Sequence, residues 1–165
     1  MKFFPKLTFL HSSIIFNLVW ISSVGFKSPL VGLCFLIIWL FLLQPKKREL
    51  SYVLIVGSIG LAIDMCFVRS GWITLSNEHP AHLILPLLWV AFPCLTLCFF
   101  KHFRLSMSIV SIVTVVSGFF SYYAATSFSV ITINWHNYLF TIFFILFWLG
   151  LMPIAKVIFR RLECV

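Results

Sequence analysis

The sequence predicts an all-α membrane protein, a bundle of six transmembrane helices with both termini in the cytoplasm. Three observations support this fold class: the composition, the spacing of the apolar runs and the distribution of the basic residues. Of the 165 residues, 62% are hydrophobic and only 10% are charged, and the mean hydropathy is +1.10. A soluble domain is about half apolar and about a quarter charged, and one small core cannot bury this much apolar surface. The composition therefore excludes a soluble enzyme, a disordered chain and a secreted disulfide scaffold.

Six apolar runs are each long enough, or nearly long enough, for the roughly 20 residues with which a helix crosses a bilayer. Short breaks with Pro, Asn, Ser and Lys separate them, and none could hold a second domain. We therefore expect one integral-membrane domain over residues 1–165. Its spans are predicted at about 7–25, 29–43, 50–68, 83–100, 105–126 and 138–159.

The first three runs have recognisable limits. The first begins after Lys6; polar residues interrupt it and no small-residue cleavage site follows, so we expect a retained span and not a signal peptide. The second is the shortest and begins at Pro29, a residue favoured in the first turn of a helix. The third lies between the basic segment 46–48 and Arg69.

The last three runs contain residues that shape helices. The fourth contains Pro86 and Pro93, and the sixth contains Pro153; transmembrane helices tolerate proline because neighbouring groups satisfy the freed carbonyls. The fifth carries small and polar side chains at alternating spacings of three and four, from position 111 to position 125. This spacing predicts a stripe that faces the bundle. We expect the many aromatic residues within the runs to face lipid.

The basic residues determine the predicted orientation. The formal net charge is +8, and 10 of the 12 Lys and Arg residues lie at the termini and in the second and fourth connections. The other connections hold only Lys27 and Arg69. This bias follows the positive-inside rule and predicts cytoplasmic termini. Because the basic residues occupy gaps between apolar runs and not one solvated face, we expect no nucleic-acid partner.

Metal and cofactor sites are not predicted. The five cysteines are an odd number, and at least three lie inside apolar runs, where a thiol behaves as a small buried hydrophobe. Glu78, His79, His82 and His136 belong to outer connections and could bind zinc only if these loops met. The nucleotide-binding and hydrolase motifs are missing from the sequence. We expect no cofactor and no metal.

Asp64 is the only aspartate of the chain and lies well inside the third run. A charged side chain in hydrocarbon costs at least about 2.5–3.5 kcal/mol on insertion scales. Gly57 and Gly60 share its helix face, so another helix can approach closely there and the carboxyl group should point into that contact. Gly118 is a third position predicted to allow close helix packing.

Depth within the spans predicts which residues surround Asp64, namely Asn17, Trp20, Trp89, Ser121 and Tyr122. We expect these side chains to form a polar intramembrane cluster in the outer half of the bundle. Two interpretations of the cluster stay open. Asp64 is either a structural clasp between helices or a functional group that handles a proton or a lipid headgroup in a cavity.

The order of several short motifs resembles a bacterial family of inner-membrane proteins, domain of unknown function 2878. These motifs are Asn17-x-x-Trp20, Gly60-x-x-x-Asp64 followed by Arg69-Ser-Gly71, Pro86-x-x-Trp89 and Gly118-x-x-Ser121-Tyr122. The chain departs from the family pattern at Phe92-Pro93 and at Phe119. The resemblance covers nearly the whole chain. It implies a location in the bacterial inner membrane and, through an association with fatty-acid-modifying proteins, a role linked to lipids.

The leading functional hypothesis is a non-enzymatic component that binds a membrane lipid or scaffolds a lipid-modifying enzyme. The alternative is a small proton-coupled transporter or flippase in which Asp64 senses the proton or the headgroup. The third is an integral membrane enzyme that uses Asp64 as a lone acid or base. A carboxylate dyad within one chain is excluded, because no second Asp or Glu lies in a span.

Overall fold

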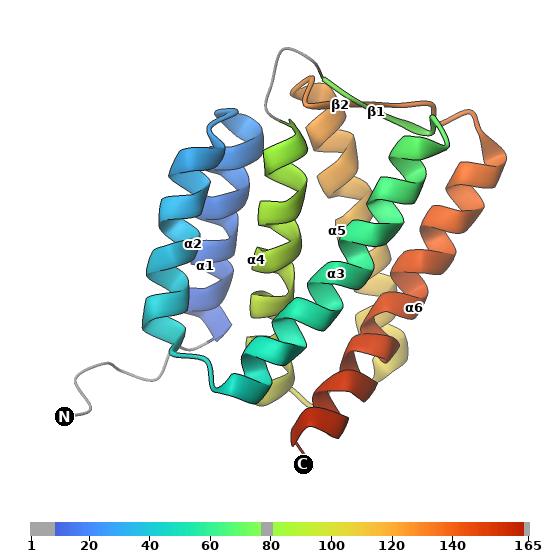
Figure 1. Ribbon diagram of the computed structural model, residues 1–165. Coiled ribbons are helices and arrows are strands. Elements are labelled where there is room, and N and C mark those ends of the chain that lie inside the picture. Colours follow the sequence, from blue (N-terminus) through green and yellow to red (C-terminus); the bar gives the residue numbers. More distant parts are fainter. Residues whose placement is uncertain (1–8, 77–80, 164–165) are drawn as a thin grey trace.

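In the described part of the chain, six helices form a bundle that a two-stranded sheet covers at one end (Figure 1). The computed structural model describes residues 9–76 and 81–163. The helices are α1 (Phe9–Trp20) with its π-helical continuation η1 (Ile21–Gly25), α2 (Pro29–Leu43), α3 (Lys47–Arg69), α4 (Ala81–His102), α5 (Met107–Ser127) and α6 (Tyr138–Glu163). The all-α class and the six helices predicted from the sequence are confirmed.

The helix limits follow from local chemistry. Pro29 opens α2, and Gln44 ends it in the left-handed conformation, with φ of 45°. The backbone N–H of Lys46 donates to Glu49 Oε2 at 2.9 Å, which caps the start of α3. Gly71 follows α3 with φ of 74°, a conformation that glycine adopts without steric cost.

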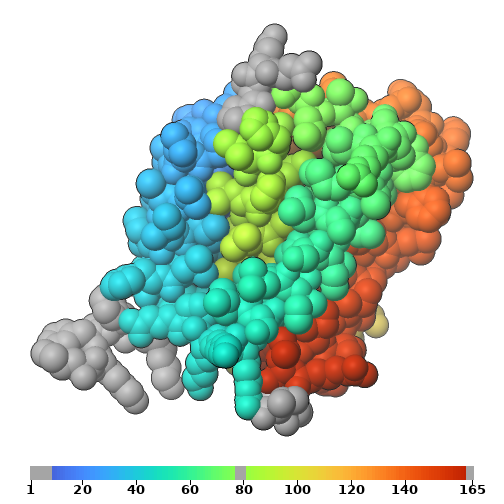
Figure 2. All heavy atoms as spheres, in the orientation of Figure 1, coloured from blue at the N-terminus to red at the C-terminus, as the bar shows by residue number. Residues whose placement is uncertain are grey.

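Helix α3 and the three helices that follow it are long and apolar enough to cross a membrane, whereas the α1–η1 segment and α2 are shorter. In space, each helix packs against the next one in the order α2, α1, α4, α3, α6, α5. On the face in Figure 2, the side chains of α2, α4, α3 and α6 lie side by side. Large apolar side chains are exposed around the bundle, for example Leu10 (67%), Phe120 (64%) and Leu139 (62%). Large exposed apolar surface marks contact with a membrane or with another protein.

Strands β1 (Ile73–Leu75) and β2 (Ile131–Ile133) pair in antiparallel fashion, with Thr74 opposite Thr132. The polar residues of these two connections predict only loops, so the paired strands are a difference from the prediction. Ile73 and Ile131 point into the bundle and are buried, while the two threonines are exposed. The sheet therefore closes the end of the bundle opposite the end at which α1 begins and α6 ends (Figure 1).

Aromatic side chains form much of the core. The expectation that those within the runs face lipid is wrong for several of the largest, including Trp39, Phe140, Phe144 and Trp148. On α6, Phe140, Phe144 and Trp148 follow one another at intervals of four, so they share one helix face. That face packs against α3 and α5, where Phe140 meets Phe67 and Phe144 meets Tyr122 edge to face. Such aromatic pairs contribute about 0.5–1.5 kcal/mol beyond the burial of their area.

Candidate functional site

Asp64 lies buried in α3, with only 1% of its surface exposed. Its Oδ2 accepts a hydrogen bond from Trp89 Nε1 of α4 at 2.6 Å. Its Oδ1 accepts one from the Tyr122 hydroxyl of α5 at 2.5 Å. One carboxyl group thus connects three helices, and each of its oxygens has one protein donor.

The glycines of α3 allow this arrangement. A Cβ on Gly60 would overlap the indole ring of Trp89, and a Cβ on Gly57 would overlap the Trp89 carbonyl oxygen. Both positions must therefore be glycine for α4 to lie so close to α3. Gly118 has the same role on α5, because a Cβ there would come within 2.6 Å of the Trp148 ring.

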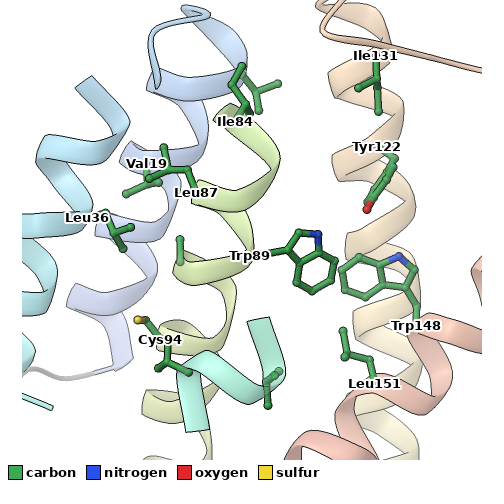
Figure 3. Close-up of a cluster of buried hydrophobic side chains, with 14 of the residues drawn as sticks. Val19, Leu36, Ile84, Leu87, Trp89, Cys94, Tyr122, Ile131, Trp148 and Leu151 are labelled. Carbon is green, nitrogen blue, oxygen red and sulfur yellow. The ribbon is translucent and has the colours of Figure 1, made fainter. Parts of the chain in front are cut away.

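A partly open cavity of about 70 Å³ lies beside this cluster, between α1 and α4 on one side and α5 and α6 on the other. Figure 3 shows Trp89 reaching from α4 toward Trp148 of α6, with Tyr122 and Ile131 nearby. The backbone of α5 packs against α6 and not closely against α1 or α4, so side chains span the intervening space. The lining residues are Phe16, Trp20, Val24, Asp64, Ile84, Leu85, Leu88, Trp89, Phe92, Ser121, Tyr122, Ala125, Val130, Ile131 and Trp148.

Five of the six residues of the predicted polar cluster line this cavity: Trp20, Asp64, Trp89, Ser121 and Tyr122. Ser121 does not bond to Asp64; it accepts a hydrogen bond from Trp20 Nε1 at 2.9 Å, which joins α1 to α5. Asn17 does not join the cluster. Its side chain is exposed and donates to the Ser13 carbonyl oxygen of its own helix at 2.8 Å.

Trp148 and Phe92 are the main lining residues that sequence reasoning missed. The Trp148 ring stacks on Trp89, with centroids 5.9 Å apart and planes at 22°, and Phe92 meets Trp148 edge to face at 5.6 Å. A spacing of four with Phe140 and Phe144 was the available signal for Trp148. In an almost uniformly apolar helix, that signal does not stand out from the other aromatic residues.

The cavity has a distinct electrostatic character. Among the described residues that line it, Asp64 is the one that can carry a charge at neutral pH. Arg69, five residues further along the chain, is exposed, and the salt bridge that the structure shows within residues 9–76 and 81–163 joins Lys101 and Glu49 at 2.7 Å. The carboxyl group is therefore surrounded by aromatic rings and neutral donors.

A metal site is not formed by the described part of the chain, where no three His, Cys, Asp or Glu side chains converge. Glu78 and His79, two of the candidate zinc ligands in the sequence, lie outside the described residues. His82 and His136 are exposed. Cys94 and Cys98 are buried, and Cys98 accepts a hydrogen bond from Ser12 at 3.1 Å.

The fold and the cavity define an α-helical membrane protein with one carboxyl group buried beside an aromatic-lined cavity. The chain belongs to the family described as protein of unknown function DUF2878, whose model matches residues 9–154. This match confirms the resemblance drawn from the sequence motifs. No curated protein and no solved structure shows significant similarity to the chain.

Proposed function

We propose that this protein is a non-enzymatic lipid-binding component of the bacterial inner membrane. In this proposal all six helices lie in the membrane, both termini are cytoplasmic, and the cavity beside Asp64 holds the polar end of a membrane lipid. The bound lipid would be kept in place for a lipid-modifying partner enzyme. The single observation that carries the proposal is the cavity itself, which combines apolar walls with one carboxyl group in its lining.

The chemistry of the cavity suits an amphipathic ligand. Binding sites for small molecules are mostly apolar, with a few polar groups that fix the orientation of the ligand. Here the aromatic and aliphatic walls would contact the apolar part, while Asp64 and Ser121 offer oxygen atoms to the polar part. A carboxylate can accept about four hydrogen bonds, and the two protein donors leave acceptor positions for a ligand.

Binding is favoured over catalysis by the way the carboxyl group is held. Trp89 and Tyr122 donate to its two oxygens from two helices, which fixes it as a hydrogen-bond acceptor. A catalytic site also combines an acid or base with a nucleophile or a group that stabilises developing charge. Ser121, the other hydroxyl of α5 in the cavity lining, accepts a hydrogen bond from Trp20.

The proposal is tested by filling the cavity without touching the cluster. Ala125 lines the cavity, whereas its neighbour Ala124 does not. Ala125→Leu adds an isopropyl group to the cavity wall, and Ala124→Leu adds the same group elsewhere on α5. Native mass spectrometry of the gently extracted proteins should show a lipid species that the wild type and Ala124→Leu retain and Ala125→Leu loses. Equal lipid retention by all three proteins would refute the proposal.

A further inference from the structure

We propose that the cavity recognises a positively charged amino group, either a primary ammonium or its methylated forms, on the polar end of its ligand. This inference rests on the proposed lipid-binding function and names the class of headgroup. Three properties of the site carry it: the charge of its lining, its aromatic walls and its size.

The charge of the lining favours a cation. Asp64 is 1% exposed, and its two hydrogen-bond donors, an indole and a phenol, are both neutral. A buried carboxylate without a positive partner is unfavourable, because neutral donors replace only part of its hydration. Within the described lining, no Lys, Arg or His side chain supplies that partner. A ligand ammonium would supply it and would donate to the acceptor positions that Trp89 and Tyr122 leave free.

The same lining disfavours an anionic headgroup. A phosphate or carboxylate would enter a space whose described lining contains one acidic side chain and no basic one. Like charges at short range repel strongly where water is excluded. A neutral hydroxyl could donate to Asp64, but it would leave the carboxylate charge without a positive partner.

Aromatic rings supply the second argument. Trp20, Trp89, Trp148 and Tyr122 all line the cavity, and Tyr122 lies 6.3 Å from Trp148 between ring centroids. A cation is attracted to the face of an aromatic ring within about 6 Å, most strongly to tryptophan, and clusters of such rings recognise ammonium groups. An apolar pocket for an acyl chain alone would need neither the tryptophans nor the carboxylate.

The size of the cavity supports a headgroup and not a whole lipid. A volume of about 70 Å³ corresponds to about five to seven water-sized groups, at roughly 10–15 Å³ for each. This space accommodates an ammonium with a few carbon atoms. The remainder of the ligand would then lie outside the cavity, among the surrounding lipids.

The test compares three amphiphiles with the same dodecyl chain and different headgroups: dodecylammonium, dodecan-1-ol and dodecyl phosphate. Their binding to the full chain in neutral maltoside micelles is followed by the change in intensity and wavelength of tryptophan fluorescence. We expect dodecylammonium to bind at least about tenfold more tightly than either of the others, or about 1.4 kcal/mol. The formal net charge of +8 makes the test stringent, because non-specific attraction would favour dodecyl phosphate.

Asp64→Asn keeps the shape of the side chain and removes its charge, so it should abolish the preference for dodecylammonium over dodecanol. Should this variant fail to fold, Trp20→Leu replaces it and should weaken dodecylammonium binding more than dodecanol binding. Equal binding of the ammonium and the alcohol by the wild type, or tighter binding of the phosphate, would overturn the inference. If the wild type and Ala124→Leu bound the amphiphiles in either of these cases and Ala125→Leu did not, the lipid-binding function would stand without the preference for an ammonium group. If no amphiphile bound, or Ala125→Leu bound them all like the wild type, both proposals would fail.

Discussion

Replacement of Tyr122 by phenylalanine should measure what the hydrogen bond to Asp64 contributes to the bundle. The substitution removes one hydroxyl group and leaves the ring, which is 92% buried against its neighbours, in place. After the substitution, Trp89 is the remaining side-chain donor to the carboxyl group. The change also removes the bond that connects α5 to α3.

The expected loss of stability follows from the two ends of the bond. Hydrogen bonds to charged groups contribute about 1.5–3 kcal/mol to stability, and a buried acceptor that loses its donor incurs a comparable penalty. Interhelical hydrogen bonds in membranes average about 0.6 kcal/mol, with the strongest near 1.7. Because the acceptor here is a carboxyl oxygen at 2.5 Å, the upper part of this second range applies. We expect the free energy of unfolding to fall by about 1.5 kcal/mol.

The next residue of α5 provides a matched control. Tyr123 is 56% exposed and lies about 100° further around the helix axis, so Tyr123→Phe removes the same hydroxyl from an exposed side chain. It should change stability by less than about 0.5 kcal/mol. Equilibrium unfolding in mixed micelles, followed by circular dichroism as dodecyl sulfate is added, compares both variants with the wild type. If Tyr122→Phe were no more destabilising than Tyr123→Phe, Asp64 could not be holding α5 to α3.

Three other predictions concern packing, charge and orientation. Gly60→Ala should cost about 1–3 kcal/mol of the free energy of unfolding, because its Cβ overlaps a buried ring; Gly150→Ala, whose Cβ would meet only a methyl group at 4.0 Å, should cost nothing in the same unfolding assay. Lys101→Met should lower the free energy of unfolding by less than about 1 kcal/mol, because the ion pair of Lys101 with Glu49 is partly exposed. At high salt the difference from the wild type should disappear. A larger effect would mean that the pair is shielded from water. A single cysteine in place of His136, in a chain without its native cysteines, should react with an impermeant maleimide added outside intact spheroplasts, and protection there would contradict the predicted orientation.

The helices were predictable because their signal is local. Apolar runs interrupted by proline and charge give the positions of six helices, and the limits of α2 agree with the predicted 29–43. The strands were not expected, because three residues are too few for a periodic signal. Their pairing also joins segments 58 positions apart, from Thr74 to Thr132. The only sequence signal for these strands is the alternation of apolar and polar residues in Ile-Thr-Leu and Ile-Thr-Ile.

Site residues were predictable where an apolar helix contains a glycine or a polar residue that indicates which face packs inward. The glycines of α3 identify the face on which Asp64 lies, and depth counting brought Trp89 and Tyr122 to the same level. The rotation of a helix is harder to infer, so Asn17 was placed in the cluster although its side chain bonds within α1. For α6, which has no polar landmark at this depth, neither depth nor rotation singled out Trp148.

The structure also changes the choice between a clasp and a functional group at Asp64. The two protein donors occupy one acceptor position on each oxygen, so a structural role leaves the carboxyl group available to a ligand at the edge of the cavity. The two roles are then linked energetically, because a ligand that binds only the folded protein stabilises it by RT ln(1 + [L]/Kd). Loss of the ligand should loosen the contacts between α3, α4 and α5 that the carboxyl group holds. Asp64→Asn would therefore reduce stability more in the presence of the bound lipid than in its absence, which a purely structural clasp would not do.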